Sequence, residues 1–272
     1  MAELIGFIGL GALGAPIATN LLAAGYPLLV HNRTAAKADG LVARGAGRAD
    51  RSVDAVRPGG IVVTLLWDDA SVEEVVARDG FLDALGPGGV HVSMSTISPA
   101  GSRRLAAMHA ERGCLFVEAP VFGRPEAAVA RQLWIACAGP AAAKARVRPI
   151  LEAMGAAGVF DFGEEVGAAT TVKLVGNFMI GAAARSLAEG LAAAEANGCD
   201  PEAVVAMLTT TLFPAPIYQS YGRLLVEKTV VMNAGQADIG RKDLGLFRAM
   251  AAEAGAPTPM ADFISGASGP RR

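Results

Sequence analysis

A glycine-rich motif near the start of the chain constrains its fold more than any other feature. Residues 9–14 form a G-x-G-x-x-G pattern between the apolar run Leu4–Ile8 and a helical pattern over Ala12–Ala24. A strand, a glycine turn and a helix in this order are typical of a dinucleotide-binding unit. The three glycines permit a tight turn, a close approach of pyrophosphate and close packing of the helix. The motif predicts six cofactor-binding residues: Gly9, Leu10, Gly11, Ala12, Leu13 and Gly14.

The residues after the next expected strand, Leu28–His31, indicate which dinucleotide binds. An NAD-preferring site places Asp or Glu here, and such a carboxylate would repel a 2′-phosphate. This chain has Asn32, Arg33 and Thr34 instead. Arginine can pair with a phosphate, and threonine can donate a hydrogen bond to it. The pattern favours NADP(H), with NAD(H) as the alternative if Arg33 is only a solvated loop charge.

Short β-like runs alternate with helical stretches through the first half of the chain. This alternation predicts an α/β fold with a doubly wound parallel sheet. Ser71 with Glu74, and Ser98 with Pro99, are expected to begin helices. The expected strands are Leu4–Ile8, Leu28–His31, Ile61–Leu65, Val90–Ser93, Leu115–Val117, Leu133–Cys137 and Val159–Phe162.

The second half of the chain is purely helical in pattern. It begins with a long Ala-rich helix over Val166–Asn197, and Asp200 is expected to cap the next helix. We therefore expect a dinucleotide-binding Rossmann domain at residues 1–163 and an all-helical domain at 164–272 for substrate binding and dimerisation. The Ala-rich helix favours close packing between subunits, which predicts a homodimer or homotetramer. The tail from Ser265 is expected to be loosely held.

Composition excludes several classes of protein. The net charge is −2 and no basic stripe occurs, which argues against a nucleic-acid partner. The most apolar later stretch, Leu174–Ala184, is shorter than the ~20 residues that span a bilayer, so no membrane partner is expected. Three widely spaced cysteines and three histidines form no disulfide framework or metal spacing. We expect a cytoplasmic protein with neither a metal nor a targeting segment.

Five motifs, in order along nearly the whole chain, resemble those of the β-hydroxyacid dehydrogenases. This family includes 3-hydroxyisobutyrate dehydrogenase and semialdehyde reductases, and it is related to 6-phosphogluconate dehydrogenase. The resemblance implies hydride transfer between a nicotinamide cofactor and a small carbonyl compound or hydroxy acid. The motifs lie at Ile5–Gly14, Ser95–Pro99, Glu118–Arg124, Gly167–Asn177 and Gly240–Leu244.

Lys173 is the residue to which the resemblance assigns acid–base catalysis, with Asn177 as its companion. The two side chains are four residues apart and so share one helix face. Their surroundings in the sequence are strongly apolar, so desolvation is expected to lower the pKa of Lys173. A lowered pKa suits proton transfer near neutral pH. The alternative is a lysine whose ammonium reaches out to solvent.

Lysine is scarce in this chain, which contains five lysines and 19 arginines. Arginine stays charged at physiological pH, whereas a lysine can be tuned to release its proton. Lys173 and Lys242 match family positions, and the resemblance implies that Lys242 contacts the cofactor. Asp243 either orients Lys242 or faces away from it. We expect Lys37, Lys144 and Lys228 on the surface.

The resemblance implies further contacts. Thr96 and Leu66 are expected at the cofactor and Ser95 at the substrate. The substrate loop is expected to comprise Val121, Phe122 and Gly123.

Two departures in that loop leave the substrate open. The family usually reads D-A-P-V-S-G-G, whereas Phe122 replaces the serine here and Arg124 replaces the second glycine. Arg124 could clamp a carboxylate or face solvent. Two alternatives remain: an imine reductase, which usually has Asp or Tyr in place of Lys173, and a non-catalytic nucleotide-binding module, which typically lacks that lysine. The chain is too short for 6-phosphogluconate dehydrogenase itself.

Overall fold

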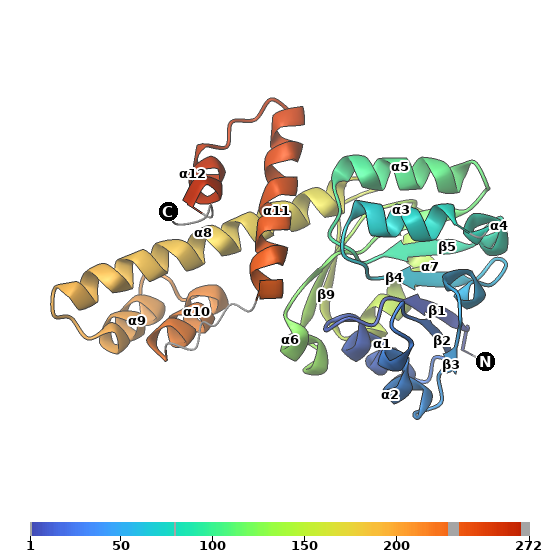
Figure 1. Ribbon diagram of the computed structural model, residues 1–272, viewed down its shortest axis with the longest axis horizontal. Coiled ribbons are helices and arrows are strands. Elements are labelled where there is room, and N and C mark those ends of the chain that lie inside the picture. Colours follow the sequence, from blue (N-terminus) through green and yellow to red (C-terminus); the bar gives the residue numbers. More distant parts are fainter. Residues whose placement is uncertain (1, 79, 228–233, 268–272) are drawn as a thin grey trace. The chain divides into compact units, whose positions relative to one another are not determined.

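The computed structural model describes residues 2–78, 80–227 and 234–267 (Figure 1). The chain divides into two compact units, Met1–Lys173 and Leu174–Arg272. The expected boundary, between residues 163 and 164, precedes the long helix α8 (Ala168–Ala196), whereas this division falls inside the helix. The first turn of α8 belongs to the first unit because it is hydrogen-bonded to a strand of that unit, as described below.

A six-stranded parallel sheet forms the centre of the first unit, in the order β3-β2-β1-β4-β5-β6. The order reverses beside β1, as in a doubly wound fold, and this confirms the predicted fold class. The strands are β1 (Ile5–Ile8), β2 (Leu28–His31), β3 (Gly47–Arg48), β4 (Ile61–Thr64), β5 (Val90–Ser93) and β6 (Leu115–Glu118).

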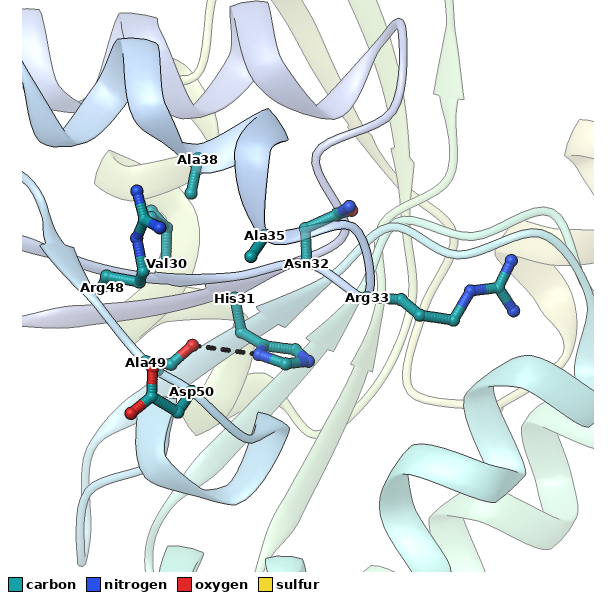
Figure 2. A pocket seen from close by; sticks show the side chains of 9 residues that line it. All are labelled: Val30, His31, Asn32, Arg33, Ala35, Ala38, Arg48, Ala49 and Asp50. Atoms are coloured by element: carbon teal, nitrogen blue, oxygen red, sulfur yellow. Dashed lines mark hydrogen bonds between the residues drawn. The ribbon is translucent and has the colours of Figure 1, made fainter.

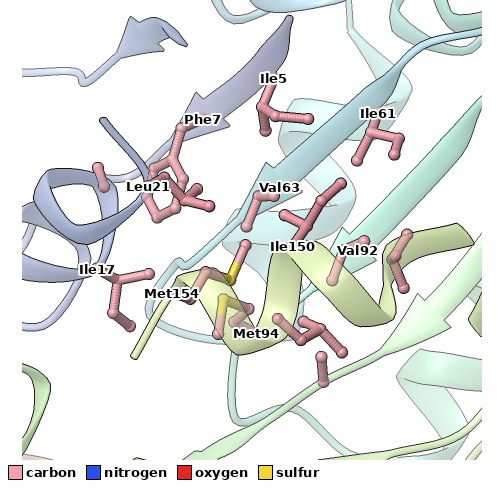
Figure 3. Packing of buried hydrophobic residues seen from close by; sticks show 14 of the residues in the cluster. Ile5, Phe7, Ile17, Leu21, Ile61, Val63, Val92, Met94, Ile150 and Met154 are labelled. Carbon is pink, nitrogen blue, oxygen red and sulfur yellow. The ribbon is translucent and has the colours of Figure 1, made fainter. Parts of the chain in front are cut away.

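Helices cover both faces of this sheet and bury two hydrophobic clusters (Figure 1). Successive side chains of a strand point to opposite faces. Phe7 of β1 accordingly packs in the cluster shown in Figure 3, and its neighbour Ile8 packs in the other. The first cluster includes side chains of α1 (Gly14–Ala23), α2 (Asp39–Val42) and α7 (Ala141–Ala153). The second includes side chains of α3 (Asp69–Ala77), α4 (Phe81–Leu85) and α5 (Pro99–Ala110).

A second, three-stranded sheet follows β6. Strand β7 (Val121–Phe122) pairs antiparallel with β8 (Leu133–Cys137), which pairs in parallel with β9 (Ala156–Asp161). The two last expected strands therefore form a separate sheet, and β9 begins three residues earlier than expected. A short connection through α6 (Pro125–Val129) permits only antiparallel pairing of β7 and β8, since parallel strands need a longer crossover.

Helix starts are partly as expected. Ser98 caps α5, and its hydroxyl accepts the N–H of Gly101 at 2.8 Å. The expected capping box at Ser71 and Glu74 is wrong, because α3 begins earlier with Asp68 as its cap. The carboxylate of Asp68 accepts both the N–H and the hydroxyl of Ser71, at 2.8 and 2.6 Å. A charged acceptor at a helix N-terminus outcompetes a hydroxyl three residues later.

The second unit is helical. It contains most of α8, followed by α9 (Pro201–Thr210), α10 (Pro216–Val226), α11 (Ala234–Glu253) and α12 (Pro259–Ala267). Asp200 caps α9, as expected. Helices α9 and α10 approach closely, since a Cβ on Gly222 would lie 2.6 Å from a methyl of Val205. Helix α12 was not expected, and it takes in Ser265. Lys228 lies outside the described residues.

Candidate active site

The glycine loop between β1 and α1 has the geometry of a dinucleotide cradle. A Cβ on Gly9 would lie 2.2 Å from the carbonyl oxygen of Leu65, and one on Gly14 would lie 2.0 Å from that of Gly9. Gly11 differs, since a Cβ there would meet nothing within 4 Å. The N-cap, Leu13, makes no side-chain hydrogen bond, so the N-terminus of α1 can accept an anion. The residues present therefore fit the pyrophosphate of a dinucleotide.

Asn32 braces this loop. Its Oδ1 accepts the N–H of Leu10 at 2.9 Å, and its Nδ2 donates to the carbonyl of Thr34 at 3.0 Å. The amide thus links the glycine loop to the end of β2. Arg33 and Thr34 are exposed beside it.

A small pocket of about 90 Å³ lies at this end of β2 (Figure 2). His31 is held there by a hydrogen bond from Nδ1 to the carbonyl of Ala49, at 3.1 Å. Arg48 forms an ion pair with Asp39, and Arg33 extends away from Arg48. The pocket is lined by Val30, His31, Asn32, Arg33, Ala35, Ala38, Arg48, Ala49 and Asp50.

The ends of β4 and β5 are tied together by Ser95. This side chain is 1% exposed, and its hydroxyl oxygen accepts the N–H of Leu66 at 2.8 Å. Thr96, which follows it, is half-buried. Ser95 therefore shapes the loop that carries Leu66, whose side chain lies against Gly9. Its expected contact with substrate stays a prediction.

Lys173 is buried within the first unit, with 8% of its surface exposed. Its Nζ lies 4.3 Å from the centroid of the Phe122 ring, which is a cation–π contact. The structure thus brings together the expected acid–base residue and the substrate loop. Arg124, by contrast, is exposed, and its Nε lies 3.5 Å from the carboxylate of Glu126.

Glu118 is a buried carboxylate whose contacts the sequence did not reveal. Its Oε2 accepts the N–H groups of Gly167 and Ala169, at 2.8 and 3.3 Å, and its Oε1 accepts the hydroxyl of Thr170 at 2.8 Å. A carboxylate that accepts several N–H bonds at a helix N-terminus stabilises that terminus. Glu118 therefore fixes the first turn of α8, one turn before Lys173. The only sequence signal for this contact was the place of Glu118 as the first residue of the motif Glu118–Arg124.

Lys144 is a second residue whose environment differs from the expectation. We expected it on the surface, but it is 9% exposed. Its ammonium contacts the carboxylate of Asp161 and donates to the carbonyl of Gly163 at 2.8 Å. The hydrogen bond from Lys144 holds the pKa of Asp161 below its ordinary value. Lys144 thus ties α7 to the end of β9.

The helical unit contains a second polar group. Asp243 of α11 is 4% exposed; it accepts the amide of Asn177 at 2.6 Å and pairs with Lys242 at 2.9 Å. A carboxylate can only accept hydrogen bonds, so Nδ2 of Asn177 must face it, and Oδ1 points elsewhere. Asp243 therefore orients both Lys242 and Asn177.

Among the described residues, no three His, Cys, Asp or Glu side chains gather as metal ligands would. Across the same ranges, no helix combines the length and apolarity needed to cross a bilayer.

Comparison with known proteins gives matches over almost the whole chain. Residues 4–175 match the NAD binding domain of 6-phosphogluconate dehydrogenase. Residues 167–267 match the family described as NAD-binding of NADP-dependent 3-hydroxyisobutyrate dehydrogenase.

Individual relatives agree with these families. An uncharacterized oxidoreductase of Bacillus subtilis, YfjR, is 40% identical over 260 residues, which cover 95% of this chain and 90% of the relative. The NAD-dependent L-serine dehydrogenase of Pseudomonas aeruginosa is 33% identical, over 94% of this chain and 88% of that enzyme. The solved 3-hydroxyisobutyrate dehydrogenase of Mycobacterium tuberculosis, with L-serine, is 26% identical and has a TM-score of 0.85, over 98% of this chain and 93% of that one.

These findings fit a dehydrogenase better than an imine reductase. The chain therefore belongs to the β-hydroxyacid dehydrogenase family, as an NAD(P)-dependent oxidoreductase.

Proposed function

We propose that this protein uses NADP(H) to interconvert a small carbonyl compound and its alcohol, with Lys173 as the general acid and base. The observation that carries the proposal is the buried Lys173 ammonium against Phe122 of the substrate loop. A buried lysine can exchange a proton near neutral pH more readily than a solvated one.

The protein's own residues would act as follows. The bound nicotinamide supplies or accepts the hydride. Lys173 Nζ donates a proton to the carbonyl oxygen as negative charge develops on it, and removes the hydroxyl proton in the reverse direction. Asn177, four residues later on α8, would hold the substrate or the lysine through its Oδ1. Asp243 keeps the amide of Asn177 in that orientation.

The preference for NADP(H) would come from the end of β2. Asn32 is neutral and engaged with the glycine loop, while Arg33 is exposed there and available to a 2′-phosphate. A charge-assisted hydrogen bond contributes about 1.5–3 kcal/mol. Arg33→Ala should therefore weaken NADPH binding by about tenfold or more and change NADH binding little. Titration of both cofactors checks this, and equal losses would contradict the assignment.

The reaction itself is tested with a panel of short aldehydes, keto acids and cyclic imines. Each is offered with NADPH, and the absorbance of the cofactor is followed. Reduction of aldehydes or keto acids is expected. Turnover of cyclic imines alone would overturn the proposal in favour of an imine reductase.

We also propose that the protein is a cytoplasmic homodimer or homotetramer. The support for assembly is a set of large apolar side chains exposed on the helical unit. The support for a reducing compartment is that the three cysteines of the protein form no disulfide bond. The exposed apolar residues include Met179, Met207, Leu212, Phe213, Met260 and Phe263.

A further inference from the structure

We propose that Phe122 determines substrate specificity, by selecting uncharged carbonyl compounds over those that carry a carboxylate. The inference rests on the proposed function, because it concerns the surroundings of the Lys173 ammonium.

The position of the Phe122 ring is set by the second sheet. Phe122 pairs with Trp134, and Val121 with Ile135, across the β7–β8 ladder. Val121 is buried, which anchors the strand. This pairing fixes the backbone of Phe122, and the centroid of its ring lies 4.3 Å from Lys173 Nζ.

The side chains of this loop offer a poor environment for a carboxylate. Binding a carboxylate in a buried site requires hydrogen-bond donors or a cation. Val121 is apolar, and the guanidinium of Arg124 is drawn to Glu126 on the surface. Gly123 has no side chain to donate a hydrogen bond. A larger residue would not fit there, since a Cβ would lie 2.5 Å from Leu133 and the φ of Gly123 is +143°.

The ring itself discriminates by charge. The face of an aromatic ring carries partial negative charge, so it attracts an ammonium and repels an anion. A carboxylate beside Phe122 would lose its hydration without gaining a donor from the ring. It would also draw the Lys173 ammonium into an ion pair and away from the reacting oxygen. An apolar substituent, in contrast, packs against the ring at no such cost.

A matched pair of four-carbon aldehydes tests the proposal. Butanal and succinic semialdehyde have the same chain length, and they differ in a terminal methyl or carboxylate. We expect kcat/KM with NADPH to favour butanal by about tenfold or more in the unaltered protein. Phe122→Ser, which introduces a hydroxyl donor and opens space, should shift the ratio toward succinic semialdehyde by about tenfold.

Phe122→Leu is the matched control. It removes the ring but keeps an apolar side chain and adds no donor, so it should keep part of the preference for butanal and lie between the unaltered protein and Phe122→Ser. The affinity of each variant for NADPH, measured by titration, should be unchanged and serves as the check on folding. A preference of the unaltered protein for succinic semialdehyde would overturn the inference, as would an unchanged ratio in Phe122→Ser.

Failure of the proposed function has a different signature. In that case neither aldehyde is reduced, and no other compound of the panel oxidises NADPH. Binding of two unreactive analogues, butanamide and succinamate, then decides the preference on its own. Butanamide should raise the melting temperature of the NADPH-bound protein more than succinamate does, and the reverse order would overturn the inference.

Discussion

Two lysines of the first unit are buried to the same degree, yet they have different partners. Lys144 is 9% exposed and Lys173 is 8% exposed. Lys144 is held by the carboxylate of Asp161 and the carbonyl of Gly163, whereas the Phe122 ring lies over Lys173. The contacts of Lys144 join α7 to the end of β9, whereas the ring over Lys173 belongs to the loop that is expected to bind substrate. Burial alone therefore does not separate a structural lysine from the one that we propose as the acid and base.

The largest effect on stability is expected where the ion pair of Lys144 is broken. Asp161→Asn leaves the buried ammonium without its carboxylate, and we expect a loss of about 2–3 kcal/mol in the free energy of unfolding. Lys144→Met is the matched control and should cost less, because the half-exposed Asp161 can be hydrated once its partner is gone. Urea unfolding measures both.

The catalytic activity of these two variants tests the comparison a second time. Both should keep the kcat/KM of the unaltered protein, since Lys144 is a structural residue. A marked fall in kcat for either variant would break the contrast between the two lysines. So would an Asp161→Asn variant that is no less stable than Lys144→Met.

A somewhat smaller loss of stability is expected on acidification, and it comes from two buried histidines and not from the lysines. His109 donates through Nδ1 to the carbonyl of Leu105, and its Nε2 contacts His91, which in turn contacts Thr64. Burial lowers the pKa of His109 to about 4, and it also lowers the pKa of His91. The unfolded chain then binds more protons than the folded one between pH 6.5 and 4, so stability falls as the pH falls through this window.

We expect His109 alone to remove about 2 kcal/mol of stability between pH 7 and pH 5. Between pH 7 and pH 5, His109→Gln should flatten the slope of unfolding free energy against pH, and Lys144→Met should leave the slope in that range nearly unchanged. Urea unfolding at several pH values measures the slope. The same slope in His109→Gln as in the unaltered protein would assign the acid sensitivity to other groups.

Much of the fold follows from local signals in the sequence. The G-x-G-x-x-G spacing placed the turn between β1 and α1, and the Ser98-Pro99 pair placed the start of α5. A long helix without breakers predicted α8. These features depend on residues that are close together in the chain, where the physical rules of turns and caps apply directly.

The features that the sequence did not predict depend on contacts between residues far apart in the chain, or on a choice between two suitable helix caps. Glu118 caps a helix that begins about 50 residues later, and no local pattern encodes that distance. Lys144 occupies an exposed-looking helical position, and only the approach of β9 buries it. Asp68 and Ser71 are both good caps, and choosing between them requires knowing which one the backbone brings to the helix end.

The site was predictable in part for the same reason. The glycine loop and Lys173 have sequence signatures, whereas the ring over Lys173 depends on the register of the second sheet. The link from Asn32 to Leu10, and that from Asn177 to Asp243, each join different elements, so they appear only in the folded chain.

The most direct test of the central claim is a single-turnover reaction of Lys173→Met beside Lys144→Met. Both variants replace a buried lysine with an apolar side chain of similar length, and each is mixed with NADPH and then with a substrate from the aldehyde and keto-acid panel. Because acid–base catalysis typically contributes 10²–10⁴-fold, oxidation of bound NADPH should slow at least about a hundredfold in Lys173→Met and little in Lys144→Met. Both variants should still bind NADPH. A rate in Lys173→Met within tenfold of that in Lys144→Met would contradict the assignment of Lys173 as the acid and base.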